Sequence, residues 1–101
     1  MWYAQLGVNI GNEEDGKGNT FKRPVLVIKK FGNMFLVIPM TTGGKNSKFY
    51  YTLPKKYFGK TSRLIFSQTR FIDKKRFTHK LARINDADFL DIKEKLTAIL
   101  L

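Results

Sequence analysis

The chain has 101 residues, no cysteine, and 19 Lys or Arg against 8 Asp or Glu, so its formal net charge is +11. This length allows one domain with a single core, residues 1–101, and the lack of cysteine excludes disulfides, a thiolate nucleophile and cysteine-ligated metals. The charge indicates a polyanionic partner: nucleic acid, an anionic membrane or an acidic protein tail. The hydrophobic content of 43% indicates a folded chain rather than a disordered basic tail.

The N-terminal segment predicts a strand followed by a loop. From Trp2 to Ile10 every second residue is apolar, which is typical of a β-strand with one buried face. Residues 11–20 contain no apolar side chain and are rich in glycine and asparagine. An exposed loop is therefore expected there.

Two continuous apolar runs, residues 25–28 and 34–38, predict a pair of central strands. Gly32-Asn33 between them tolerates positive φ and predicts a tight hairpin. Because both faces of these strands are apolar, we expect them to be covered on each side, as in a small barrel with a helix packed against it. The predicted fold class is therefore mainly β, with one added helix.

The second half of the chain predicts two short strands and a terminal helix. Residues 50–53 and 64–67 read as strands, joined by a connection rich in lysine. Asn85 or Asp86 is the expected cap of the helix. Its apolar stripe has helical spacing, which is typical of a core-facing side. The stripe consists of Phe89, Ile92, Leu96, Ile99 and Leu100.

No apolar run exceeds about five residues, far below the roughly 20 needed to span a bilayer. The start of the chain also lacks the pattern of a secretory signal peptide. We therefore expect a cytoplasmic protein without a membrane segment.

Several segments resemble known functional motifs but lack residues that those motifs require. Residues 11–17 (GNEEDGK) have the spacing of a phosphate-binding loop, but Gly18 replaces the Ser or Thr that binds magnesium, and the three acids inside would repel phosphate. Those acids lie in one loop, whereas metal sites usually gather ligands from separate elements. His79 is the only histidine and is expected at the surface, so a hydrolase triad is improbable. Neither a metal nor a cofactor is expected.

If the protein is an enzyme, its catalytic groups are therefore expected to be arginine and hydroxyl side chains. Cleavage of RNA by its own 2′-hydroxyl is a reaction that such groups can catalyse. When a 2′-hydroxyl attacks the neighbouring phosphate, an arginine fork stabilises the crowded phosphorane and a threonine can donate a second hydrogen bond. Arg23 begins one predicted central strand and Thr41 ends the next, so a hairpin at Gly32-Asn33 brings both to one edge. We expect these two side chains to meet. For Arg23 alone, a solvated charge at a strand end is the ordinary alternative.

Four segments, in this order, resemble one family, the MazF/PemK toxins of bacterial toxin–antitoxin systems. They are residues 6–13 (LGVNIGNE), 23–28 (RPVLVI), 38–42 (IPMTT) and 67–76 (SQTRFIDKKR). The resemblance covers nearly the whole chain. It implies an SH3-like barrel with a C-terminal helix, assembled as a homodimer. It also implies a metal-independent, sequence-specific endoribonuclease that cleaves single-stranded mRNA and inhibits translation.

The resemblance also assigns residues and a partner. Arg23 and Thr41 fall on the catalytic arginine and threonine. The positions expected to bind RNA are Asn12, Glu13, Phe21, Ser67, Gln68 and Arg70, with Gln68 and Arg70 in a strand that lines the substrate groove. A cognate antitoxin with an acidic, flexible tail is expected to occupy the same groove, which suits the charge of +11.

Two points stay open at this stage. Some members carry an arginine or an acid where Ile65 and Ser67 stand here, so the general base is not identified, and Arg23 is a poor base at its usual pKa. A non-catalytic module of the same architecture is the alternative, either an RNA binder or a gyrase poison like the related CcdB toxins. Membrane binding is disfavoured, because the terminal helix mixes acids with its lysines.

Overall fold

The computed structural model describes residues 1–8, 20–44 and 46–101, and every bound below refers to these residues. The strands are β1 (Trp2–Val8), β2 (Thr20–Phe31), β3 (Met34–Thr41), β4 (Tyr50–Leu53), β5 (Ser62–Ile65), β6 (Arg70–Asp73) and β7 (Phe77–Lys80). Three single-turn 3-10 helices are η2 (Lys55–Tyr57), η3 (Phe66–Gln68) and η4 (Lys74–Arg76), and α1 (Asp86–Leu100) ends the chain. Within these residues no helix is both long and apolar enough to span a bilayer.

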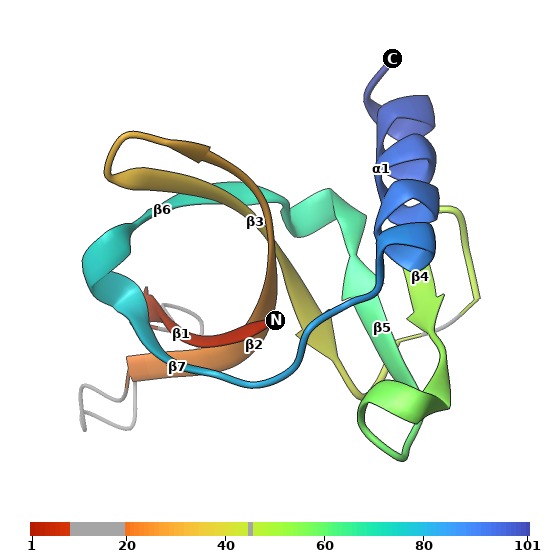
Figure 1. Cartoon of the computed structure of the whole chain (residues 1–101), viewed down its shortest axis with the longest axis horizontal. Helices are drawn as coiled ribbons and strands as arrows, with labels where there is room; N and C mark the ends of the chain where they lie inside the picture. The colour runs from red at the N-terminus through yellow and green to blue at the C-terminus, as the bar shows by residue number, and fades with distance from the viewer. Residues whose placement is uncertain (9–19, 45) are drawn as a thin grey trace.

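The strands form one antiparallel sheet in the order β4-β5-β3-β2-β1-β7, and β6 adds to β3. β3 is the central strand of the sheet, because it pairs with three others. One of its edges pairs with β2, and it also pairs with β6 through residues 34–37 and with β5 through residues 40–41. The sheet curls into the ring of strands seen in Figure 1, while α1 stands beside β4 and β5. Among the described residues no ladder joins β6 to β7, which are linked by η4. The predicted barrel is therefore present but not fully hydrogen-bonded around its circumference.

The two faces of the sheet bury separate clusters of apolar side chains. The inner cluster comes from strands of the ring and contains Ala4, Leu6, Val25, Val37 and Ile72. The outer cluster lies between the sheet and α1, and it includes Leu26, Ile38, Met40, Leu64, Ile92 and Leu96. Successive residues of β2 and β3 alternate between the two clusters, as the two-residue period of a strand requires. The prediction that these strands are covered on both faces is confirmed.

Helix α1 is held by a cap, an apolar face and a tyrosine. Asn85 is the cap, because its side chain accepts a hydrogen bond of 2.8 Å from the backbone N–H of Asp88. Ile92 and Leu96 are buried as predicted, but Leu100 is 64% exposed, so the predicted stripe is wrong at its last position. Leu100 follows Ile99, which packs against the outer cluster, and its own side chain is directed away from that cluster.

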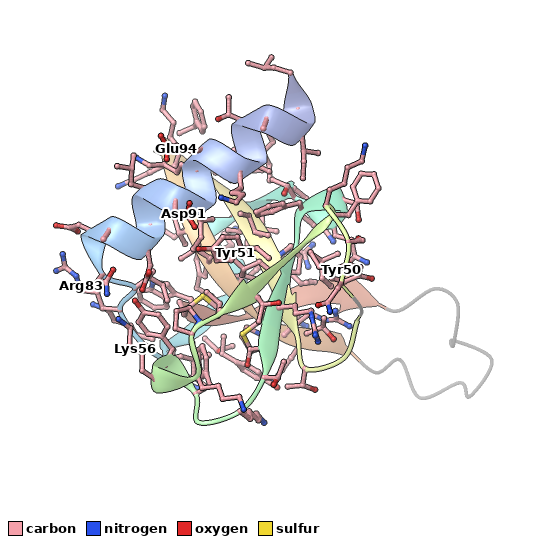
Figure 2. The ribbon with its side chains drawn as sticks, turned by 90° about the vertical axis from the view of Figure 1, so that its right-hand side faces the viewer. Tyr50, Tyr51, Lys56, Arg83, Asp91 and Glu94 are labelled. Atoms are coloured by element: carbon pink, nitrogen blue, oxygen red, sulfur yellow. The ribbon has the colours of Figure 1, made fainter. Side chains whose placement is uncertain are left out.

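The phenol of Tyr51, on β4, donates a hydrogen bond of 2.6 Å to Asp91 Oδ2 on the helix above it (Figure 2). Burial, and then this hydrogen bond, raises the pKa of Tyr51. The same bond, followed by that from Lys95, lowers the pKa of Asp91. At neutral pH the phenol thus keeps the proton that it donates, and the carboxylate that accepts it is ionised. The pair ties α1 to the edge strand of the sheet.

The structure differs from the sequence prediction mainly where strands carry charge. β2 extends from Thr20 to Phe31, well beyond the predicted residues 25–28, because ladder hydrogen bonds continue where the side chains are lysine and arginine. β5 ends at Ile65, and the predicted end of that strand is the 3-10 turn η3 instead. Residue patterns do not predict β6 and β7, since each has only four residues and few apolar ones, and a strand at Arg70 is implied only by the family resemblance. Residues 9–19, which complete the predicted first strand and loop, lie outside the described residues.

Candidate active site

Several strand ends meet at one end of the sheet. Because β1, β2 and β3 run antiparallel in turn, and β5 runs antiparallel to β3, the end of β1, the start of β2, the end of β3 and the start of β5 lie toward one end of the sheet. We call this end the rim. Arg70, at the start of β6, pairs with Val37 further along β3, and its side chain reaches Leu6 of β1. Its members considered below are Leu6, Arg23, Thr41, Arg63 and Arg70. The rim therefore gathers residues that lie up to 64 positions apart in the chain.

Arg23 is a half-buried cation on the rim. It pairs with Ala4 across the β1–β2 ladder, and Ala4 belongs to the inner cluster. Burial lowers the pKa of the Arg23 guanidinium, but arginine starts so high that it keeps its charge. Partial desolvation also strengthens its attraction to an anion. Arg23 is therefore suited to stabilise negative charge and unsuited to accept a proton.

The register of β2 and β3 relates Arg23 to Thr41. The last pair of that ladder toward the rim is Val25 with Pro39. Arg23 lies two residues before Val25, and Thr41 lies two residues after Pro39. Because side chains of a strand alternate between its faces, Arg23 is on the same face as Val25, and Thr41 is on the same face as Pro39. The β2–β3 ladder ends at Val25 and Pro39, and beyond it Met40 and Thr41 pair with β5, so Arg23 and Thr41 lie toward the same end of the hairpin without forming a ladder pair. That their two side chains meet stays a prediction.

The hydroxyl of Thr41 is oriented by the turn that follows it. Its Oγ1 accepts a hydrogen bond of 3.1 Å from the backbone N–H of Gly43. Because this bond uses a lone pair of the oxygen, the hydroxyl proton is left to be donated elsewhere. The next residue, Gly44, has φ +89°, and a Cβ there would lie 2.8 Å from Cε1 of Tyr50. The turn after Thr41 thus needs glycine at this position.

Arg63 is a rim residue that the sequence analysis did not single out. It lies opposite Thr41 in the β3–β5 ladder. Its Nη1 donates to the carbonyl of Gly43 at 3.3 Å, and its Nη2 donates to Asn46 Oδ1 at 3.4 Å. Its Nε is buried and has no hydrogen-bond partner among the described residues. The guanidinium therefore braces the same turn that orients Thr41, a role that no spacing in the sequence indicates.

The other predicted RNA-binding residues are divided among three places. Arg70 begins β6, and its Nη1 donates to the carbonyl of Leu6 at 3.2 Å, so its side chain reaches β1 at the rim. Ser67 and Gln68 are exposed on η3, so the expectation that Gln68 lies in a strand is wrong. The chain turns there to pass from β5 to β6. Phe21 lies in β2, but its side chain, like Asn12 and Glu13, is outside the described part of the chain.

Among the described residues, most acidic side chains lie on α1, away from the rim. Of the five acidic residues in the described ranges, four lie on α1 and the fifth, Asp73, pairs with Met34 near the β2–β3 turn, away from the rim. The rim contributes Arg23, Arg63 and Arg70. Within the same ranges no cluster of His, Asp and Glu is arranged to hold a metal ion. The chemical groups that the rim offers are the guanidinium groups of these arginines and the hydroxyl of Thr41.

Comparisons with known proteins agree with this architecture. A family model described as PemK-like, MazF-like toxin of type II toxin–antitoxin system matches residues 1–100. The crystal structure of MazE-MazF (Form-II) from Deinococcus radiodurans aligns with a TM-score of 0.75 and 21% identity, over 98% of this chain and 89% of that chain. MazF (Form-I) from the same organism aligns with a TM-score of 0.71 and 21% identity, over 98% and 92%. No curated protein matches the chain. The predicted fold is confirmed.

The brace formed by Arg63 predicts a local effect at Gly43. Arg63→Ala removes two hydrogen bonds to the turn, each worth about 1 kcal/mol, so the amide of Gly43 should exchange with solvent roughly tenfold faster. Hydrogen exchange followed by NMR measures this rate. Arg83→Ala is the matched control, because Arg83 makes only an exposed contact with Asp86 in the described structure. Unchanged exchange at Gly43 in Arg63→Ala would show that the brace does not hold the turn.

Proposed function

Because the chain belongs to the PemK-like, MazF-like family of toxins of type II toxin–antitoxin systems, we propose that it is an endoribonuclease. Its substrate is single-stranded RNA, mRNA included, which it cuts at a preferred sequence without a metal ion. Cutting mRNA inhibits translation, which makes the protein a toxin, and it acts in the cytoplasm. The observation that supports the proposal is the β2–β3 hairpin, which carries an arginine on β2 and a hydroxyl oriented by the following turn on β3 toward one of its ends.

The reaction uses the RNA itself as the nucleophile. The 2′-oxygen attacks the adjacent phosphorus and releases its proton, the bond from phosphorus to the 5′-oxygen of the next nucleotide breaks, and that oxygen takes up a proton. The products are a 2′,3′-cyclic phosphate and a free 5′-hydroxyl. The intermediate phosphorane carries extra negative charge, so groups that bind it more tightly than the starting phosphate lower the barrier.

Arg23 and Thr41 take complementary parts in this proposal. The guanidinium of Arg23 bears two N–H edges that match phosphate oxygens, and its charge is permanent. Thr41 accepts from Gly43, so its own proton can be given to a second phosphate oxygen. In this proposal Arg70, whose side chain reaches Leu6, and the exposed Ser67 and Gln68 bind further nucleotides of the strand.

Cleavage of a mixed-sequence single-stranded RNA in EDTA tests the proposal. Ends with a 2′,3′-cyclic phosphate are expected. Arg23→Ala should reduce the rate by about 10²–10³, the usual effect of removing one group that stabilises transition-state charge, and Thr41→Ala should also be strongly impaired. Lys93→Ala, an exposed change on α1, should cut at the wild-type rate. Intact RNA would refute the proposal, and blocked gyrase supercoiling in the same preparation would favour the CcdB-like alternative.

The active form in this proposal is a homodimer. Its support is apolar surface near the end of α1, where Phe49 is 42%, Leu100 64% and Leu101 99% exposed. Ile99 and Phe49 also line a neighbouring groove of about 540 Å³. Exposed apolar patches of this kind are typical of interaction surfaces.

Light scattering tests the dimer. Wild type should have about twice the mass of the 11.7 kDa chain, because pairing removes this surface from water. Leu100→Glu should give the monomer mass, since a charge cannot enter that contact, whereas Lys93→Glu on the exposed side of α1 should not. A monomeric wild type at high micromolar concentration would contradict the assignment.

An antitoxin with an acidic tail is the proposed protein partner. One solved structure similar to this chain, from Deinococcus radiodurans, is named MazE-MazF, and the charge of +11 here favours an acidic segment as partner. If that segment occupies the rim, polyglutamate should inhibit RNA cleavage, and the inhibition should weaken as salt rises from 50 to about 300 mM. A neutral peptide of equal length is the control. Inhibition independent of charge or salt would argue against this mode of binding.

A further inference from the structure

A second concave surface lies directly behind the rim. It is a pocket of about 420 Å³ whose lining includes Tyr3, Pro24, Met40, Thr42, Lys60 and His79. We call it the outer pocket. None of its residues was expected to have a function, and His79 was predicted to be a simple surface residue.

The outer pocket shares backbone with the rim. Pro24 follows Arg23, and Thr42 follows Thr41. Neighbouring residues of a strand point to opposite faces, and Thr42 directly follows the last residue of β3, so the pocket is on the other face of the sheet from the Arg23–Thr41 position. An extended strand that crosses the rim can therefore place its phosphate on one face and reach the pocket on the other.

The walls of the pocket suit a flat ring. The rings of Tyr3 and His79 lie side by side, with centroids 5.3 Å apart and planes at 34°. The apolar floor includes Met40, which is 4% exposed, and Phe58. Aromatic faces over an apolar floor are what single-stranded RNA-binding sites use to stack bases.

Polar groups at the edge of the pocket suit a nucleotide better than an aliphatic side chain. Thr78 Oγ1 donates to the carbonyl of Tyr3 at 2.8 Å and also lies 3.3 Å from Nδ1 of His79, where the donor and acceptor roles depend on the tautomer of the ring. The imidazole thus brings polar ring nitrogens to the edge of the pocket. Thr42 adds a hydroxyl, and Lys60 adds a cation for phosphate. An aliphatic ligand would leave all three groups without a role.

We propose that the outer pocket binds one base of the RNA strand, from a nucleotide next to the one cleaved at Arg23 and Thr41. This assignment rests on the proposed function, because it supplies the RNA with a second contact beyond the reacting phosphate. It makes Tyr3, Thr42, Lys60 and His79 determinants of which sequence is cut.

The single histidine provides a direct probe of this site. The ring signals of His79 can be assigned without ambiguity, since the chain has no other histidine. In the Arg23→Ala protein they should shift on titration with nucleoside 5′-monophosphates, and differently for purines and pyrimidines. Nucleosides should shift them too, whereas inorganic phosphate alone should not. Equal shifts with phosphate and nucleotide would overturn the assignment of a base site.

Affinity for RNA provides the second test, with an uncleavable 2′-O-methyl strand that contains the preferred cutting sequence. Lys60→Ala and His79→Ala should each weaken binding about tenfold or more, as expected for loss of one stacked or phosphate-bound nucleotide, while Lys93→Ala should not. Both changes are at exposed positions. If wild type cuts RNA and both variants bind like wild type, the pocket assignment is wrong and the proposed nuclease stands. If wild type neither binds nor cuts RNA, the nuclease proposal fails, and the titration of His79 still judges the pocket.

Discussion

The pairing of β3 is the constraint on which the candidate active site depends. This one strand is hydrogen-bonded to β2, β5 and β6, and its last residue is Thr41. Three neighbours deliver Arg23, Arg63 and Arg70 to the same end. A shift of one residue in any of these ladders would turn the side chains of that strand to the other face. The spacing of the rim is therefore a consequence of register and not of local sequence.

The register is secured by burial on both faces of the central strands. Val25 and Val37 are fully buried in the inner cluster, while Leu26 and Ile38 are buried in the outer cluster beneath α1. A one-residue slip would exchange these sets, and the two spaces differ in shape, so packing opposes it. Tyr51 and Asp91 add a polar tie that keeps α1 over the outer cluster. Buried residues that have no proposed contact with RNA thus hold the rim in place.

The distribution of acidic and basic side chains bears on which partners the protein can bind. The acids of the described chain are concentrated on α1, and the cations of three strands converge at the rim. In the proposed function, a polyanion such as RNA or an acidic tail would be attracted to the arginines of the rim, whereas three of the four acids on α1 are already paired with cations. The inner side of the rim offers charge and a hydroxyl for a phosphate, and the outer pocket offers aromatic walls. In the proposed mode of binding, each face recognises a different part of the same nucleotide chain.

The sequence by itself determined the class of fold, the two central strands, the helix with its Asn85 cap, and the hairpin that carries Arg23 and Thr41 toward one end. These features follow from the spacing of apolar residues along the chain and from the turn at Gly32-Asn33, and both can be recognised in the sequence. Only the tertiary structure decided that Arg63 braces the turn beside Thr41, that Gln68 lies in η3, and that Tyr3 and His79 share a pocket wall. Each of these depends on contacts between segments that are distant in the chain, and the short, charged strands that create them leave no apolar pattern in the sequence.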